Sequence, residues 1–521
     1  MKSLHLNSVI FSDIPFPDLL TRNYGAHVIS NQIVNQGYTS CVVDFASSLD
    51  WHTFTEIVDR FIGEGTLLVG FSVTWFQYRA LNLRRFLDTT DEQQGVIDID
   101  DTPDNTSYRE SLSYNFSIGN SKKYVDYIKS KNPNVKVIVG GAKAYEYIDD
   151  EWFDHILIGY SENQIVDLVN NIKSNTVTNR ILNYDVKAQH GNFNFSNSSV
   201  HYHGNDFINK DDVLIIELAR GCIFNCTFCS WPLRGQNTKL YQKYKETIKK
   251  ELMENYRLWG VTKYAIADDT FNDSVEKLKL IKEVVDELPF KPMFWCYARL
   301  DLISAHPEMA QLMLDIGIVE VFYGIETWND ETAKLIRKGN RNRKIEGLEI
   351  AHSVWGDNVS ISAALVVGLP EDTIESFEQF KLWFSERGKY IIDFVGVNPL
   401  FLRKPDHNYQ YLFLSDIEQN LDRYNYSFDE QGGLLSWVRN DRGDISTREI
   451  AEQVAKNLVD TLDKPVKRAH GKIDYTSHIH RIIKQDGLSN TEAVDLYAKN
   501  FYFPNLIKSF DKYKRRMTGE T

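Results

Sequence analysis

Hydrophobic and polar residues alternate along the first part of the chain in two patterns. Short apolar runs bounded by polar or turn residues predict buried strands, and the longer amphipathic stretches between them predict helices. The strand runs are SVIF, TSCVVDF, TLLVGFSV, VKVIVGG and HILIGY, all within residues 1–160. Five such strands alternating with helices predict an α/β domain with an open, doubly wound, Rossmann-like sheet.

A second block of strands and helices begins near residue 213 and repeats six times. Its strands are VLIIELARGC, KYAIADD, PMFWCYARLD, VEVFYGIE, VSISAALVVGLP and YIIDFVGVNPLF, and the helices between them include residues 239–258 and 275–288. Six βα units predict a partial TIM-like (β/α)6 barrel. In such barrels the functional groups lie at the carboxyl ends of the strands.

Polar stretches divide these blocks. Residues 88–104 carry seven acidic residues and no basic one, which predicts an exposed insertion. After residue 415 the pattern becomes helical, and Ser489-x-x-Glu492 predicts a helix start. We therefore expect, in chain order, a Rossmann-like domain (1–182) with an insertion at about 87–121, a linker (183–212), a barrel (213–414) and a mostly helical C-terminal region (415–521).

Length and composition restrict the class of protein. A chain of 521 residues exceeds one hydrophobic core, so two or three domains are expected. No apolar run approaches the roughly 18 residues needed to span a bilayer, and the start shows no secretory signal, which predicts a cytoplasmic protein without a membrane partner. The net charge of -13 argues against a nucleic-acid partner, and we interpret the basic run Lys512–Arg516 as a solvated helix end.

Three of the five cysteines, Cys222, Cys226 and Cys229, share one loop after the first barrel strand. In a reducing compartment, clustered thiols favour metal binding over disulfides. Structural zinc sites and ordinary cubane clusters use four protein ligands, so three cysteines leave one metal position open. A zinc site completed by a distant histidine is the alternative.

The spacing Cys-x-x-x-Cys-x-aromatic-Cys, with Phe228 as the aromatic residue, precedes further βα units. In this the chain resembles the radical S-adenosylmethionine superfamily. The resemblance implies that the three cysteines hold a catalytic [4Fe-4S] cluster whose open iron binds the amino and carboxylate groups of S-adenosylmethionine. It also implies reductive cleavage to a 5'-deoxyadenosyl radical, with an electron donor such as flavodoxin or ferredoxin.

Strand ends carry further residues that match this family. Asp268 and Asp269 stand where the family binds the amino group of S-adenosylmethionine, although an aspartate there can also cap a helix. Arg299 resembles the arginine that ends the third strand and suits a carboxylate. Period-2 alternation places Cys296 on the opposite face of that strand, as a buried small hydrophobe, and Cys41 in the first domain has the same interpretation.

Two later strands continue the resemblance. Glu326 ends the fourth strand where the family binds the ribose hydroxyls. The stretch Ala364-x-Val366-x-Gly368-x-x-Glu371 is similar to the family's adenine-contacting GxIxGxxE, with alanine and valine replacing glycine and isoleucine. Val366 and Gly368 are therefore expected near the adenine.

The first domain resembles that of the cobalamin-binding branch of the superfamily. The glycines Gly140 and Gly141, and Gly159 in GYSE, end strands where a corrinoid could approach the backbone, and they could equally serve turns. The branch's cobalt-ligating Asp-x-His-x-x-Gly is missing after the first strand, and His52 follows the second strand without the glycine. Cobalamin is therefore a candidate second cofactor that rests on fold analogy.

The resemblance implies a methyltransferase that C-methylates an unactivated carbon with cobalamin. The alternative is a rearrangement or cyclisation enzyme whose first domain holds no corrinoid, and a non-catalytic iron-sulfur or zinc protein is a third hypothesis. Methylthiotransferases and peptide maturases with auxiliary clusters need more cysteines, and none follows Cys296. The substrate, a small molecule or a peptide, is not indicated.

Overall fold

A computed structural model describes residues 4–12, 21–44, 46, 49, 51–74, 121–183, 193–210, 212–236, 238–403, 414–429, 436–441, 443–463 and 512–519. The chain divides into two compact units: 1–215 with 250–261 and 495–521, and 216–249 with 262–494. The expected insertion at 87–121, apart from Ser121, and the expected helix start at Ser489 lie outside the described residues.

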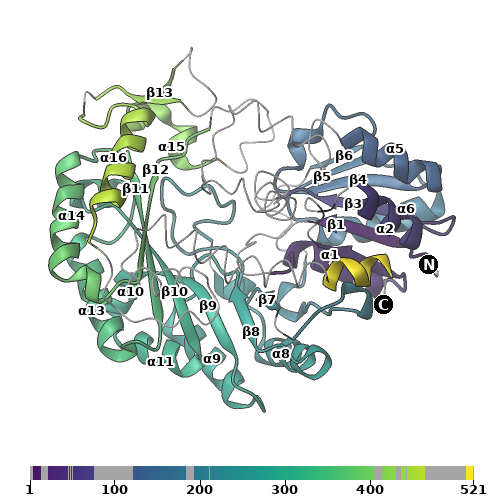
Figure 1. Cartoon of the computed structure of the whole chain (residues 1–521), viewed down its shortest axis with the longest axis horizontal. Helices are drawn as coiled ribbons and strands as arrows, with labels where there is room; N and C mark the ends of the chain where they lie inside the picture. Colours follow the sequence, from purple (N-terminus) through teal and green to yellow (C-terminus); the bar gives the residue numbers. More distant parts are fainter. Residues whose placement is uncertain are drawn as a thin grey trace, which may run out of the picture. The chain divides into compact units, whose positions relative to one another are not determined.

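The first unit contains a parallel six-stranded sheet with the order β2-β1-β3-β4-β5-β6 (Figure 1). Its strands are β1 (Ser8–Ser12), β2 (Ser40–Val43), β3 (Leu68–Ser72), β4 (Lys136–Gly141), β5 (His155–Ile158) and β6 (Ile181–Asn183). Strand order reverses at β1, which confirms the doubly wound sheet. The five expected strands are confirmed, and the three-residue edge strand β6 is additional.

Helices cover both faces of this sheet. They are α1 (Tyr24–Asn35), α2 (Trp51–Phe61), α5 (Ser121–Lys131) and α6 (Glu162–Ser174). Helices α1 and α6 contact each other and bury an aliphatic core that includes Ile10, Val42 and Ile138. Helices α2 and α5 contact each other as well, and Phe54 of α2 packs edge-on to Tyr124 of α5 at a ring distance of 4.7 Å.

Two segments far along the chain belong to the first unit. One is the expected linker, in which Tyr202 is buried. The backbone of its residue His201 exchanges hydrogen bonds of 2.7 and 2.8 Å with the side chain of Asn31 in α1. The helix at 512–518 buries Tyr513, whose ring lies 4.7 Å from the Arg22 guanidinium. The basic run at 512–516 therefore lies on a helix with one buried face, while Lys512 and Arg515 remain exposed.

The second sheet has six strands in the order β12-β11-β10-β9-β8-β7, and every register pair described in it is parallel (Figure 1). The strands are β7 (Val213–Ile216), β8 (Lys263–Ile266), β9 (Met293–Ala298), β10 (Ile318–Glu326), β11 (Ser360–Val367) and β12 (Phe394–Pro399). All six expected strands are confirmed. Sequential order in a parallel sheet is that of a partial (β/α) barrel.

Helices connect these strands and cover the outer face of the sheet. They are α8 (Lys245–Trp259), α9 (Val275–Asp286), α10 (Leu300–Ala305), α11 (Glu308–Ile316), α12 (Asp330–Leu335), α13 (Arg341–Trp355) and α14 (Ile374–Glu386). On β11 the outward residues Ala363, Leu365 and Val367 are fully buried, whereas the alternate residues Ala364 and Val366 are half-buried. The inner face of the sheet is therefore the more accessible one.

The C-terminal region of the second unit follows β12. It contains α15 (Asp416–Gln419), the antiparallel pair β13 (Tyr426–Phe428) and β14 (Trp437–Arg439), and α16 (Arg448–Thr461). Helix α16 contacts β12, the edge strand of the sheet. This protects an edge whose backbone would otherwise be unpaired. Within the described ranges, no helix is both long and apolar enough to cross a bilayer.

Candidate functional site

The three-cysteine loop leaves the carboxyl end of β7 and folds back on itself. Backbone hydrogen bonds join Cys222 N to Leu233 O (3.2 Å), Gln236 N to Cys222 O (2.9 Å) and Gly235 N to Phe224 O (2.8 Å). Gly221 has a φ of 87°, and a Cβ there would lie 3.0 Å from Leu233 O, so the turn requires glycine. Cys226 is buried, while Cys222, Cys229 and Phe228 are half-buried.

Burial controls the chemistry of these thiols. It raises the pKa of Cys222, and it raises the pKa of Cys229 to about 12 despite a bond from the Trp231 amide. Among the described residues, no three His, Cys, Asp or Glu side chains are grouped as ligands of one metal ion. In a cubane each cysteine binds a different iron atom, and three cysteines of one loop can supply three of the four iron ligands of a [4Fe-4S] cluster.

Three other segments hold the loop. Thr227 N donates to Ile336 O (3.3 Å), and Ile417 N of α15 donates to Thr227 O (3.0 Å). The Thr270 hydroxyl, after β8, lies 3.3 Å from the Cys222 sulfur. The cysteine positions are thereby fixed by elements from three distant parts of the second unit.

Asp268 and Asp269, at the end of β8, have different surroundings. Asp268 Oδ1 accepts from Leu218 N (2.7 Å) and Ala219 N (3.0 Å), and its Oδ2 lies 2.7 Å from Lys277 Nζ. Asp269 is half-buried, and burial, together with Asp268 and Glu217, raises its pKa to about 7. Asp268 therefore ties β7 to β8, and Asp269 keeps a carboxylate for a ligand.

Arg299 follows β9 and is buried against the cysteine loop. Its Nη1 lies 3.6 Å from the Cys226 sulfur, and its guanidinium lies 3.7 Å from the Phe224 ring centroid. Nε and Nη2 donate to the Asp301 carboxylate at 2.9 and 2.7 Å. Asn272 accepts from Arg299 N and donates to Arg299 O, which holds the backbone.

Glu326 ends β10 in a left-handed conformation, with φ of 65°. Such a backbone costs about 1–3 kcal/mol in a residue other than glycine, and it is typical of functional turns. The side chain folds back over Gly324, where a Cβ would lie 1.9 Å from Glu326 Oε1. Lys338 Nζ pairs with that oxygen at 3.1 Å, and Lys344 Nζ donates to Thr327 O at 2.9 Å.

The end of β11 is held by the C-terminal region. Gly368 has φ of 94°, and a Cβ there would lie 2.6 Å from the Trp437 ring. Tyr426 donates to Gly368 O at 2.5 Å, and Trp437 Nε1 donates to Leu400 O at 2.8 Å. Val366 is half-buried on the inner face. Gly368 is therefore required for packing against Trp437, in addition to the adenine contact expected of it.

In the first unit, Gly140 and Gly141 end β4. Gly141 has φ of 114°, and a Cβ there would lie 2.3 Å from Thr74 Oγ1. Gly159, after β5, has φ of 93°. In this fold order the ligand-binding switch point lies at the carboxyl ends of β1 and β3, and residues 13–20 and 75–120 that follow these strands lie outside the described residues.

Three further residues considered in the sequence lie outside the site. Cys41 and Cys296 are both 0% exposed, which confirms the expectation of small buried hydrophobes. His52 is on α2 with 81% of its side chain exposed, 3.7 Å from Glu56. It is therefore a surface histidine.

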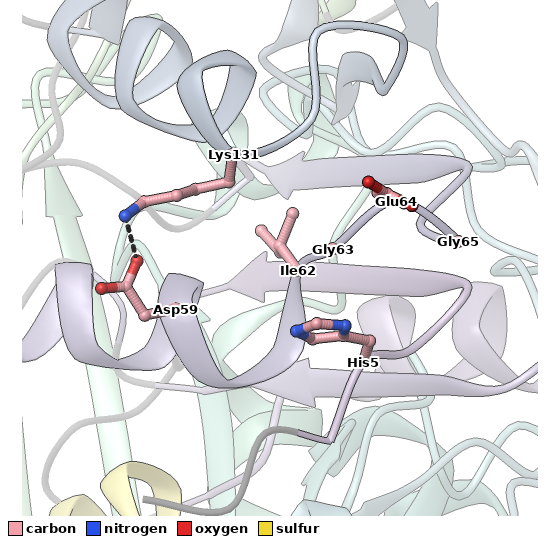
Figure 2. Close-up of a pocket in the computed structure, with 7 residues that line it drawn as sticks. All are labelled: His5, Asp59, Ile62, Gly63, Glu64, Gly65 and Lys131. Atoms are coloured by element: carbon pink, nitrogen blue, oxygen red, sulfur yellow. Dashed lines mark ion pairs between the residues drawn. The ribbon is translucent and has the colours of Figure 1, made fainter.

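A pocket of about 460 Å³ in the first unit is lined by residues that include His5, Asp59, Gly63 and Lys131 (Figure 2). His5 precedes β1 and Gly63 precedes β3, so the pocket lies at the amino ends of these strands. Lys131 and Asp59 pair across it at 2.7 Å. Ligands of doubly wound sheets bind at the opposite, carboxyl ends.

Four residues of the site were not among those predicted from the sequence: Lys338, Lys344, Phe224 and Asn272. Lys338 follows Arg337, which has φ of 61°, and that turn brings the lysine to β10. Gly339 is a usable signal, because a Cβ there would lie 2.6 Å from Asp301 Cβ. This glycine beside Lys338 is the sequence feature that could have indicated a close approach of the turn to another segment.

Part of the chain is similar in sequence to known proteins. Residues 216–384 match the Radical SAM superfamily. The hopanoid C-2 methylase of Rhodopseudomonas palustris is 28% identical over 180 residues, which cover 33% of this chain and 33% of that enzyme. The hopanoid C-3 methylase of Methylococcus capsulatus is 26% identical over 178 residues, covering 34% and 33%. The chain thus spans about one third of the length of these relatives.

A solved structure shows a similar fold over nearly the whole chain. The radical S-adenosylmethionine methyltransferase TsrM from Kitasatospora setae, with cobalamin and a [4Fe-4S] cluster bound, aligns with a TM-score of 0.60 at 13% identity. The alignment covers 97% of this chain and 100% of that one, which shows a shared fold. The match to the Radical SAM superfamily over residues 216–384 therefore identifies this part of the chain as a radical S-adenosylmethionine domain.

Proposed function

We propose that the chain is a radical S-adenosylmethionine methyltransferase that acts on an unactivated carbon, with cobalamin as its second cofactor. One observation carries the proposal. The three-cysteine loop, Asp269 and the strained Glu326 lie at the carboxyl edge of one parallel sheet, where (β/α) folds perform their chemistry. The hopanoid methylases and TsrM support methyl transfer as the reaction class.

The chain's own residues have distinct roles in this proposal. Cys222, Cys226 and Cys229 hold the cluster, which when bound supplies the electron that cleaves S-adenosylmethionine. Asp269 accepts the ammonium of the bound molecule, and Glu326 accepts the ribose hydroxyls. The inner-face residue Val366 packs against the adenine. These residues would orient the sulfonium toward the loop.

Cobalamin, when bound, supplies the methyl group. Gly140 and Gly159 present no Cβ to a corrinoid that approaches the ends of β4 and β5, whereas the Thr74 hydroxyl already occupies the space beside Gly141. The substrate is a small molecule or a peptide with an unactivated C–H bond, and an external one-electron donor such as flavodoxin or ferredoxin would reduce the cluster before each cleavage of S-adenosylmethionine.

The test begins with anaerobic reconstitution of the full chain and measurement of iron, sulfide and cobalamin per chain. With S-adenosylmethionine and a strong reductant, we expect 5'-deoxyadenosine from the wild type and none from C226A. The matched control C296A removes another buried cysteine, which lies outside the loop, and should retain iron and product.

The outcomes separate the competing functions. Product without stoichiometric cobalamin would indicate a rearrangement or cyclisation enzyme with a corrinoid-free first domain. Bound metal with no 5'-deoxyadenosine would indicate a non-catalytic iron-sulfur or zinc protein, and it would refute the proposal.

A further inference from the structure

Arg299 is oriented on all sides by its neighbours in the second unit. Asp301 accepts two hydrogen bonds, of 2.9 and 2.7 Å, from one edge of the guanidinium. The Phe224 ring covers one face at 3.7 Å. Asn272, which is 0% exposed, fixes the Arg299 backbone by donating and accepting one bond each. Bidentate pairing and stacking together leave the group little freedom.

The remaining edge of the guanidinium faces the cysteine loop. Nη1 lies 3.6 Å from the Cys226 sulfur in a buried setting, with Arg299 6% exposed. Phe224 lies two residues after Cys222, so the ring that covers Arg299 is part of the same loop as the cluster ligands. The arginine is thus attached to the cysteine loop by two independent contacts.

This geometry differs from the role that the resemblance suggested. An arginine that binds the carboxylate of S-adenosylmethionine presents an edge of its fork to the ligand. Here one edge is occupied by Asp301, and the remaining Nη1 is directed at a sulfur. The Asp301 carboxylate is ionised in this pair, because Arg299 holds its pKa below the usual range even though burial opposes this.

We propose that Arg299 is a positioning residue of the cluster, which donates to the Cys226 sulfur and raises the reduction potential of the bound [4Fe-4S] group. Reduction adds negative charge that spreads onto the thiolates, and an N–H donor directed at a thiolate stabilises that charge. Asp301 offsets the net charge of Arg299 at long range. The N–H dipole at the sulfur remains, so the effect is local to Cys226.

This inference rests on the proposed function, and it concerns the cluster instead of the substrate. The experiment uses the full chain reconstituted anaerobically, with R299M and R299K compared to the wild type. Iron and sulfide are quantified first. The midpoint potential is then measured by spectroscopic redox titration without S-adenosylmethionine, and the dissociation constant for S-adenosylmethionine is measured separately by calorimetry.

We expect R299M to titrate at a more negative potential than the wild type, with R299K between the two. Affinity for S-adenosylmethionine should stay within about twofold, because no bond to it is lost. The matched control is K338M. Lys338 lies between α12 and α13 and pairs with Glu326 at the end of β10, not with a cysteine. This variant should leave the potential near that of the wild type.

An unchanged potential in R299M, together with a loss of affinity above about tenfold, would show that the arginine binds the carboxylate, and it would overturn the inference. If R299M holds no cluster, F224L carries the test, because it removes the stacked ring and keeps every donor. F224L should shift the potential in the same direction, and an unchanged potential would contradict the proposed role of Arg299. A wild type without a cluster would refute the proposed function itself.

Discussion

Lys338 Nζ lies 3.1 Å from Glu326 Oε1 and donates a hydrogen bond of 3.2 Å to Gly324 O. The ammonium thereby joins the carboxylate to the backbone two residues before it. Lys344 Nζ holds Thr327 O on the other side at 2.9 Å. Two lysines from the α12–α13 segment therefore stabilise the left-handed turn at Glu326, which would be unfavourable without them.

Replacing Lys338 should weaken binding of S-adenosylmethionine. In K338M the carboxylate loses its cation and the turn loses one hydrogen bond, so Glu326 occupies its binding conformation less often. We expect the dissociation constant to rise about tenfold, the scale of one charge-assisted bond, with iron content unchanged. Calorimetric titration measures this, and K338R should retain most of the affinity.

The control for Lys338 is K334M, which removes an exposed lysine of α12. It should bind S-adenosylmethionine as the wild type does. Equal affinities in K338M and the wild type would mean that Glu326 does not need this ion pair.

Stability should depend on pH through Asp372, which accepts from the Thr327 hydroxyl at 2.7 Å and from Leu369 N at 3.1 Å. Burial raises its pKa from 3.8 to about 7. The folded state therefore holds a proton that the unfolded state releases between these values. The stabilisation is present below about pH 4 and is lost as the pH rises toward 7.

Urea unfolding at pH 5 and pH 8 checks this, with D372N as the matched variant that cannot titrate. We expect the wild type to lose more free energy of unfolding than D372N over this interval. Identical pH dependence in the two proteins would contradict the assignment.

Gly368 should be intolerant of alanine. The new Cβ would lie 2.6 Å from the Trp437 ring, and the φ of 94° is unfavourable for any residue with a Cβ. We expect G368A to lower the free energy of unfolding by about 1–3 kcal/mol through overpacking, in addition to the backbone term. G356A is the control, since φ there is 51° and no atom lies within 4 Å of its Cβ. Equal losses in both variants would exclude a role for Trp437.

The fold was largely readable from the sequence, because buried parallel strands are continuous apolar runs that end at turn residues. The run VSISAALVVGLP became β11 and its glycine lies directly after it. The strands β6, β13 and β14 were not anticipated. Each has three residues, and such short segments carry too little periodicity to separate them from loops.

The site was predictable where chemistry follows a strand end, and less so where it depends on a turn. The cysteine loop was predicted from its spacing together with the βα units that follow it. The pairing of Lys338 with Glu326 depends on the left-handed Arg337 and on a side chain that folds backward over Gly324. Neither feature has a sequence period. The sequence also did not indicate which of the adjacent aspartates, Asp268 or Asp269, is available to bind a ligand.

The aspartates at the end of β8 should respond differently to amidation. In D269N the fold is kept, because the described hydrogen bonds and ion pairs assign that side chain no partner, and binding of S-adenosylmethionine should weaken. In D268N the amide oxygen must face Leu218 N and Ala219 N, so its NH2 group faces Lys277 Nζ, and the buried cation loses the nearer of its two carboxylate partners. Breaking a buried pair costs at most about 3–5 kcal/mol, and Asp273, 3.5 Å from Lys277 Nζ, retains part of the pairing.

Urea unfolding and iron content measure the difference between the two variants. D268N should unfold at lower urea and hold less iron, because Asp268 fixes the strand end from which the cysteine loop starts. The double variant D268N/K277M should regain part of the stability, since it removes the ammonium that faces the new NH2 group, and only part, since Asp273 then loses Lys277. If D268N instead unfolded like the wild type and lost only affinity for S-adenosylmethionine, Asp268 would be a ligand-binding residue and the division between the two carboxylates would be wrong.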